Sequence, residues 1–186
     1  MPDSPSSPIV DEPFPLPQRW GADEVERLTA AMQQSSLFYW QGPQTTALLK
    51  SFREIYPVEH LFPCSSGTAS VHLAIAASKL IPGSEVLVPA ITDMGSVIGI
   101  LHQLLVPVFV DIDPQTYNVP PEVLREAITP KTHAILAVHH TGTPVDLDAS
   151  RAITDEPDLD LIEDCAQAWR THYGDRHACT VRCFAT

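Results

Sequence analysis

The hydrophobic positions of the chain follow two different periods. In 22–34 and 44–55 they recur every three to four residues, which predicts two amphipathic helices. From residue 68 onward, helical stretches alternate with short apolar runs rich in β-branched residues. The apolar runs, which we predict to be strands, lie at 85–88, 106–111, 133–139 and 159–163. The helical stretches between them lie at 68–80, 96–105, 121–128 and 147–154.

This alternation predicts an α/β fold of three layers, in which helices cover both faces of a mostly parallel sheet. In such sheets, ligands bind beyond the carboxyl ends of the strands. Residues 1–17 contain six prolines and little periodicity, so we predict a flexible N-terminal arm there. We therefore expect residues 18–186 to form the folded part of the chain.

Composition and charge narrow the range of partners. Hydrophobic residues make up 44% of the chain, which is typical of a folded protein. A net charge of -12 argues against nucleic acids and anionic membranes, because both bind basic patches. The most apolar stretch, 96–110, is interrupted by His102, Gln103 and Pro107, so we expect no membrane span. The first residues lack the pattern of an export signal, and we expect a cytoplasmic protein.

The cysteines are expected to be free thiols, because no export signal directs the chain to an oxidising compartment. They are Cys64, Cys165, Cys179 and Cys183. Two of them lie close in sequence to His172 and His177, which suggests a set of metal ligands. The spacing matches no standard zinc motif, and one short segment rarely supplies a closed tetrahedral site. We therefore predict no metal site.

The first candidate for chemistry is the turn Ser66-Gly67-Thr68, which directly precedes a predicted helix. Small residues leave main-chain N–H groups approachable, and a helix N-terminus carries partial positive charge, so this turn suits a phosphate group. An ordinary helix N-cap at Ser66 or Thr68 explains the same residues. The spacing alone favours the cap.

Two further candidates follow predicted strands. Asp164 comes directly after the apolar run at 159–163, which places it at the carboxyl end of a strand. A buried carboxylate there needs a cationic partner, and the protonated ring nitrogen of a cofactor would serve. A helix N-cap is the alternative role for this aspartate. His139 follows another strand and either lines the pocket or is a structural histidine.

Several segments, taken in order, resemble the DegT/DnrJ/StrS family of pyridoxal-phosphate (PLP) sugar aminotransferases, which have the type I PLP-transferase fold. The segments that carry the resemblance are WQGP at 40–43, SGTASVHL at 66–73, PGSEVLVPA at 82–90, VFVDIDP at 108–114 and IEDCAQA at 162–168. Each segment is weak evidence alone. Together the segments cover about residues 20–178, and their occurrence in this order is specific to the family.

The resemblance implies a binding site for pyridoxal 5'-phosphate. The residues that would bind this cofactor are Ser66, Gly67, Thr68, Asp93, Asp164 and Gln167. The first three would hold the phosphate, Asp164 would pair with the pyridine nitrogen, and Gln167 would lie near the phenolic oxygen. The family often has an aromatic residue stacking on the ring where this chain has Asp93, so the stacking contact is expected to differ here.

The resemblance also implies the reaction. An amino group would pass from an amino acid, glutamate or glutamine, to a keto-sugar, nucleotide-sugar or cyclitol ketone, as in nucleotide-sugar biosynthesis, and the full-length protein would be a homodimer. The family's Schiff-base lysine follows a segment like 181–186, and none of Lys50, Lys79 and Lys131 matches that position. We therefore expect a partial PLP-binding large domain, incomplete at its C-terminal end and without the small C-terminal domain. This chain alone is expected to be inactive.

Two alternatives to an aminotransferase stay open. Some relatives have a histidine in place of the lysine and are PLP-dependent sugar dehydratases. A non-catalytic remnant that still binds PLP is the second alternative. A generic dinucleotide-binding or P-loop domain is disfavoured, because neither glycine-rich motif of those folds occurs in the chain.

Overall fold

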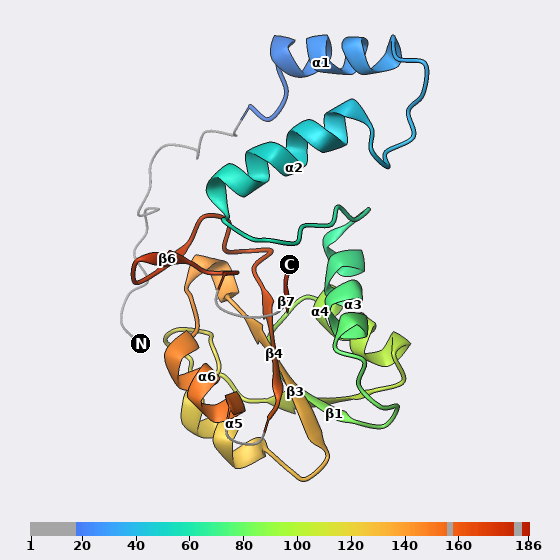
Figure 1. Ribbon diagram of the computed structural model, residues 1–186. Coiled ribbons are helices and arrows are strands. Elements are labelled where there is room, and N and C mark those ends of the chain that lie inside the picture. The colour runs from blue at the N-terminus through green and yellow to red at the C-terminus, as the bar shows by residue number, and fades with distance from the viewer. Residues whose placement is uncertain (1–17, 156–157, 181–183) are drawn as a thin grey trace, which may run out of the picture. The chain divides into compact units, whose positions relative to one another are not determined.

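The computed structural model describes residues 18–155, 158–180 and 184–186, and the predicted N-terminal arm at 1–17 lies outside them (Figure 1). The chain divides into two compact units, Met1–Thr46 and Ala47–Thr186. In the first unit, helix α1 (Ala22–Met32) begins after Gly21, whose N–H donates to the Glu24 carboxylate at 2.7 Å. Helix α2 (Pro43–Ile55) begins in the first unit and ends in the second. Both predicted N-terminal helices are therefore confirmed.

The second unit is built around a five-stranded sheet in the order β2-β1-β3-β4-β7. Every neighbouring pair of strands in it is parallel. The strands are β1 (Glu85–Pro89), β2 (Val106–Val110), β3 (Thr132–Val138), β4 (Asp160–Asp164) and β7 (Phe184–Ala185). The first four match the predicted apolar runs to within one residue at each end.

Helices cover both faces of this sheet, as the alternation predicts (Figure 1). One hydrophobic cluster joins the sheet to α3 (Gly67–Ala77) and α4 (Met94–His102), and another joins it to α5 (Pro121–Ala127) and α6 (Leu147–Asp155). Side chains of a strand alternate between faces. In β3, Leu136 therefore packs in the first cluster, whereas Ile135 packs in the second. The predicted α/β/α layering is confirmed.

The shortest elements were not predicted. A two-stranded antiparallel ribbon, β5 (His172–Tyr173) and β6 (Arg176–His177), follows β4, and a 3-10 turn, η1 (His140–Gly142), follows β3. Two-residue strands such as β5, β6 and β7 are too short to show any period in the sequence. No helix within the described part of the chain has the length and apolar content needed to cross a lipid bilayer.

Helices α3 and α4 approach each other closely along a face that carries two glycines. A Cβ atom added to Gly99 would lie 2.9 Å from the Cα of His72, and one added to Gly95 would lie 2.8 Å from Oγ1 of Thr68. Residues four apart share one face of a helix, so both glycines meet the same side of α3. The first turns of the two helices are therefore held beside each other.

We expect the substitution Gly99→Ala to destabilise the fold by about 1–3 kcal/mol, because overpacking forces the two helices apart. The free energy of unfolding, measured by urea denaturation and circular dichroism, tests this. The matched control is Gly67→Ala, where an added Cβ meets no atom within 4 Å and stability should hardly change. Equal stabilities for the two variants would contradict the close helix contact.

Candidate functional site

The parallel strands bring three connecting segments to one edge of the sheet. Strand β1 leads into residues 90–93, β3 leads into His139, and β4 ends at Asp164. The N–H of His139 donates to the main-chain oxygen of Asp164 at 3.1 Å, which extends the pairing of β3 and β4 past the last strand residues. This is the edge at which ligands bind in open α/β sheets.

The N-terminus of α3 combines a cap with open N–H groups. Ser66 is the N-cap residue, and its Oγ accepts the N–H of Ala69 at 3.1 Å. Gly67 and Thr68 are the first two helical residues, and N–H groups at these positions have no acceptor within their own helix. A Cβ on Gly67 would point into open space. The cap and an anion-binding turn therefore coexist at this helix end.

The cysteine two residues before this turn adds no negative charge to it. Cys64 carries a free, exposed thiol. Partial desolvation raises the pKa of the Cys64 thiol, which keeps it protonated near neutral pH. An anion at the α3 N-terminus would therefore meet no thiolate there.

Asp164 is a buried carboxylate with hydrogen-bond donors but no cation beside it. The residue is 5% exposed. Oδ2 accepts the Ser96 hydroxyl at 2.7 Å, and Oδ1 accepts the Ala166 N–H at 3.1 Å. Within the described ranges, no basic side chain forms an ion pair with it. A buried carboxylate in this state suits a ligand that brings its own positive charge.

The first turn of α4 lies between the helix end and the carboxylate. Asp93 is its N-cap, and Oδ1 of this exposed residue accepts the Gly95 N–H at 2.7 Å. Gly95 packs against Thr68, and the next residue, Ser96, bonds Asp164. No local sequence pattern pointed to Ser96, because it lies 68 positions from its partner Asp164.

Gln167 is bound to the turn after β3. Its Oε1 accepts the N–H of Thr141 at 2.8 Å, and Thr141 has a left-handed backbone conformation with φ 50°. The next residue, Gly142, has φ 87°, a conformation that favours glycine. Because the amide oxygen faces the main chain, the Nε2 donors of this exposed side chain are left for another acceptor.

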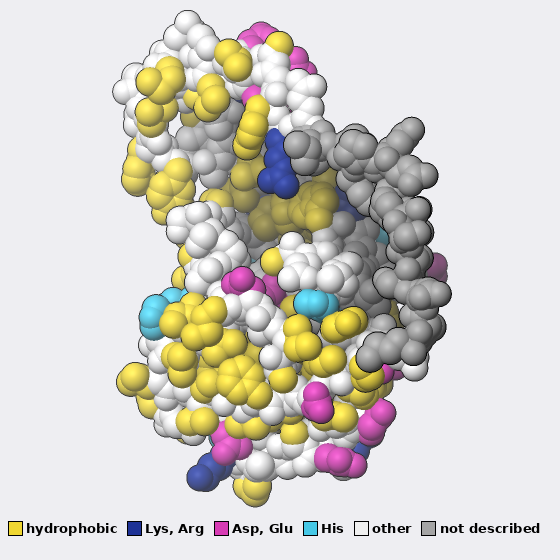
Figure 2. All heavy atoms as spheres, turned by 180° about the vertical axis from the view of Figure 1, so that it is seen from behind, with side chains coloured by type: hydrophobic (Ala, Val, Ile, Leu, Met, Phe, Trp, Pro, Cys, Tyr) yellow, Lys and Arg dark blue, Asp and Glu magenta, His cyan; other side chains and the backbone are white. Residues whose placement is uncertain are grey.

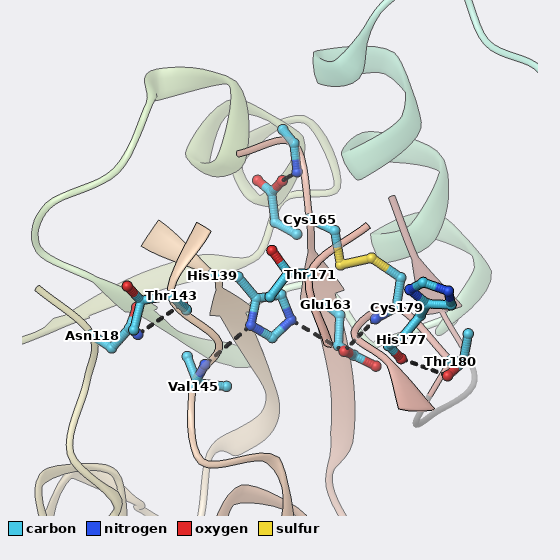
Figure 3. A network of polar contacts seen from close by, with 12 residues as sticks. Asn118, His139, Thr143, Val145, Glu163, Cys165, Thr171, His177, Cys179 and Thr180 are labelled. Carbon is cyan, nitrogen blue, oxygen red and sulfur yellow. Dashed lines mark hydrogen bonds and ion pairs between the residues drawn. A yellow bond between two sulfur atoms is a disulfide. The ribbon is translucent and has the colours of Figure 1, made fainter. Parts of the chain in front are cut away.

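His139 is fully buried. Its side chain is 0% exposed, and Figure 3 shows the ring between Val145 and Glu163. Nδ1 accepts the Val145 N–H at 3.1 Å, so Nε2 carries the ring proton and donates it to Oε2 of Glu163, also at 3.1 Å. Both ring nitrogens of His139 are therefore bonded to groups of the protein itself.

Glu163 is a buried connector that the sequence did not select. The same Oε2 atom accepts the Cys179 N–H at 2.9 Å, which ties the segment after β6 to the end of β4. The side chain is 0% exposed. Its position between two sequence-distant donors depends on the path of the chain after β4, which no local pattern reveals.

The prediction of free thiols is wrong for two of the cysteines. Cys165 and Cys179 form a disulfide across a separation of 14 residues (Figure 3). The ribbon of β5 and β6 brings the second cysteine back to the end of β4, an arrangement that the sequence spacing did not reveal. Cys64 is free, and Cys183 lies outside the described residues.

The same region holds a group of potential metal-ligating atoms. One atom each from His139, Glu163 and Cys165 lies within 4.8 Å of the others. The disulfide engages the sulfur, and the proton on Nε2 of His139 points to the carboxylate. These three atoms are therefore committed to bonds within the protein. The rings of His172 and His177, the two nearby histidines, lie against each other with their centroids 4.1 Å apart and their planes tilted by 42°.

A separate apolar cavity of about 680 Å³ lies in the second unit. Its walls include the end of α2, the segment 57–63 and the disulfide, and it contains none of the predicted cofactor-binding residues. Elsewhere, the edge strand β2 and the turn before it leave Leu104, Val106 and Phe109 exposed. Hydrophobic side chains are also prominent on the face drawn in Figure 2. Apolar surface of this kind is typical of a contact face.

The chain belongs to the DegT/DnrJ/EryC1/StrS aminotransferase family, which it matches over residues 18–186. It is 37% identical over 188 residues to the L-glutamine:2-deoxy-scyllo-inosose aminotransferase of Micromonospora echinospora, and the match covers 97% of this chain and 44% of that protein. The resemblance inferred from the motifs is therefore confirmed.

Solved structures agree with this assignment. The chain is similar to 3-amino-5-hydroxybenzoic acid (AHBA) synthase, with a TM-score of 0.88 and 28% identity over 93% of this chain and 45% of that one. It is also similar to the E. coli GDP-4-keto-6-deoxy-D-mannose-3-dehydratase with bound hydrated PLP, with a TM-score of 0.76 and 27% identity over 87% and 43% of the two chains. The predicted fold class is confirmed, and the chain spans less than half the length of these relatives.

We expect His139→Leu to lower the free energy of unfolding by about 2–3 kcal/mol, because it removes the ring donor from the buried Glu163 carboxylate. Urea denaturation measures the loss. His60→Leu is the control, since the His60 side chain is 92% exposed. If the pair is coupled, the double variant His139→Leu, Glu163→Leu will lose less than the sum of the two single variants. Strict additivity would contradict the buried pair.

Proposed function

We propose that this protein is the cofactor-binding part of an enzyme that uses pyridoxal 5'-phosphate to transfer an amino group. The donor is an amino acid, glutamate or glutamine, and the acceptor is a keto-sugar, nucleotide-sugar or cyclitol ketone. One observation carries the proposal. Two consecutive residues of α4 contact the two halves of the candidate site: Gly95 lies against Thr68 at the open N-terminus of α3, and Ser96 bonds the buried Asp164 carboxylate, which has no cationic partner among the described residues.

The residues present fit the two charged ends of this cofactor. The N–H groups of Gly67 and Thr68 suit the phosphate, and the absence of a side chain on Gly67 leaves room for it. The buried Asp164 carboxylate suits a protonated pyridine nitrogen, because that nitrogen supplies the positive charge that the described surroundings of Asp164 lack. The PLP bound in the solved dehydratase relative supports the same assignment.

Each site residue has a role that follows from its contacts. When bound, PLP serves as an electron sink for the carbon that exchanges its amino group. Asp164 holds a proton at the ring nitrogen, which preserves that capacity. The Nε2 donors of Gln167 suit the phenolic oxygen, since its Oε1 is engaged with Thr141. Asp93, exposed at the N-terminus of α4, is proposed as a polar contact in place of a stacking aromatic ring.

The acceptor is proposed from the relatives. The relative with 37% identity is an aminotransferase of a cyclitol ketone, which favours a cyclitol or a related cyclic ketone here. The dehydratase, at 27% identity, supports sugar dehydration as the second candidate function. The two are told apart by the product, because amino transfer leaves a new C–N bond and dehydration does not.

Turnover needs a base that moves a proton at the reacting carbon. None of Lys50, Lys79 and Lys131 matches the lysine that the family resemblance implies for this task. We therefore propose that these 186 residues alone bind the cofactor without catalysing the transfer. We further propose that the complete enzyme is a homodimer in the cytoplasm, and the exposed apolar side chains on β2 are compatible with a protein contact.

Pyridoxamine 5'-phosphate is the probe of choice, because it carries the phosphate and the ring nitrogen but needs no lysine for binding. We expect the 186-residue chain to bind it, and fluorescence titration measures the dissociation constant. Asp164→Asn should weaken binding by roughly tenfold or more, since an ion pair becomes a neutral contact. Gly67→Ala should weaken it through the methyl group placed in the phosphate space.

Asp160→Asn is the matched control for Asp164→Asn, because Asp160 begins the same strand at the opposite edge of the sheet. Its affinity for the probe should equal that of the wild type. Absence of binding by the wild-type chain would refute the proposed site. Binding that is equally strong in Asp164→Asn and Asp160→Asn would show that the buried carboxylate does not contact the ring.

A further inference from the structure

Ser96 is a buried hydroxyl with partners on two sides. It lies in α4 and is 3% exposed. Its Oγ donates to Oδ2 of Asp164 at 2.7 Å and lies 2.9 Å from Oγ1 of Thr92. Thr92 directly precedes the N-cap of the same helix. The three side chains therefore form a continuous line from the start of α4 to the end of β4.

The direction of the hydrogen bonds in this line follows from counting protons. An ionised carboxylate only accepts, so the single hydroxyl proton of Ser96 points to Asp164. Thr92 must then donate its proton to the Ser96 oxygen. Both hydroxyl dipoles are thus aligned toward the carboxylate, and each strengthens the next bond.

This arrangement fixes how the carboxylate is turned. Oδ2 is held by Ser96 from α4, and Oδ1 is held by the Ala166 N–H from the segment after β4. Two donors from different elements prevent rotation of the group. Each oxygen keeps further lone-pair capacity for a third donor.

The residue before Ser96 contacts the other half of the site. Gly95 has no Cβ, and any Cβ there would lie 2.8 Å from Oγ1 of Thr68 in the phosphate-binding turn. One short stretch of α4 therefore touches both the turn and the carboxylate. A shift of this helix would change both contacts together.

We propose that Ser96, supported by Thr92, is a positioning residue that aims the Asp164 carboxylate at the ring nitrogen of the bound cofactor. Gly95 sets the spacing between this carboxylate and the phosphate-binding turn. The inference rests on the proposed function, since it assigns a partner to Asp164. It predicts that loss of the Ser96 hydroxyl affects ring binding and leaves phosphate binding intact.

The experiment titrates the 186-residue chain with two probes, pyridoxamine 5'-phosphate and inorganic phosphate. Ser96→Ala should weaken binding of the first by about ten- to hundredfold, the range of a hydrogen bond to a charged group. Phosphate binding should be unchanged. Ser96→Thr, which keeps the hydroxyl, should restore most of the affinity. The ultraviolet spectrum of the bound probe reports the protonation of its ring and should change in Ser96→Ala.

Two controls separate positioning from stability. Ser150→Ala removes another buried serine hydroxyl, in α6 on the other face of the sheet, and should leave both affinities unchanged. Thr92→Val removes only the outer donor and should weaken binding of pyridoxamine 5'-phosphate by about two- to tenfold. Thr92→Val carries the test alone if Ser96→Ala does not fold.

Several outcomes would overturn the proposal. These are an unchanged affinity and spectrum in Ser96→Ala, an equal loss for both probes, or no recovery in Ser96→Thr. If Ser96→Ala does not fold, an unchanged affinity of Thr92→Val for pyridoxamine 5'-phosphate would likewise overturn the proposal. If the wild-type chain binds neither probe, the proposed function itself fails, and the positioning role fails with it.

Discussion

The candidate site depends on one constraint, which is that a carboxylate buried at the end of a central strand must receive hydrogen bonds. Burying an unpaired carboxylate costs several kcal/mol, so its surroundings must supply donors. For Asp164 these donors come from Ser96 in α4 and from the main chain of Ala166. The requirement fixes where α4 lies, and α4 in turn lies against α3 through two glycines. The open helix end and the carboxylate are therefore set by one packing arrangement.

The last two residues of β4, Glu163 and Asp164, place their carboxylates on opposite faces of the sheet. Successive side chains of a strand point to opposite faces. Asp164 points to the side of α3 and α4 and bonds Ser96, whereas Glu163 bonds His139 and the Cys179 N–H. The second carboxylate thus stabilises the edge of the sheet at which the first one lies. The disulfide that begins at Cys165 ties down the same edge.

The sequence predicted the regular part of this architecture well, because strands and helices of five residues or more carry a visible period. The apolar run at 159–163 placed Asp164 at a strand end, and the small residues of the Ser66-Gly67-Thr68 turn marked a helix start. Ser96 was not predicted as a site residue, because its partner Asp164 lies 68 positions away in the sequence. The Cys165–Cys179 pairing depends on a ribbon of two-residue strands, which leaves no pattern to read. The family was recognised from several motifs occurring in the expected order, because no single motif was specific enough.

The protonation state of the bound ring nitrogen tests the central claim most directly. Pyridoxamine 5'-phosphate labelled with 15N in its ring can be followed by NMR when bound to the 186-residue chain. A nitrogen paired with Asp164 stays protonated at pH values where the free ring has lost its proton, and this is the predicted result. A bound nitrogen that titrates as it does in free solution would contradict the account, because Asp164 would then have no part in holding the cofactor.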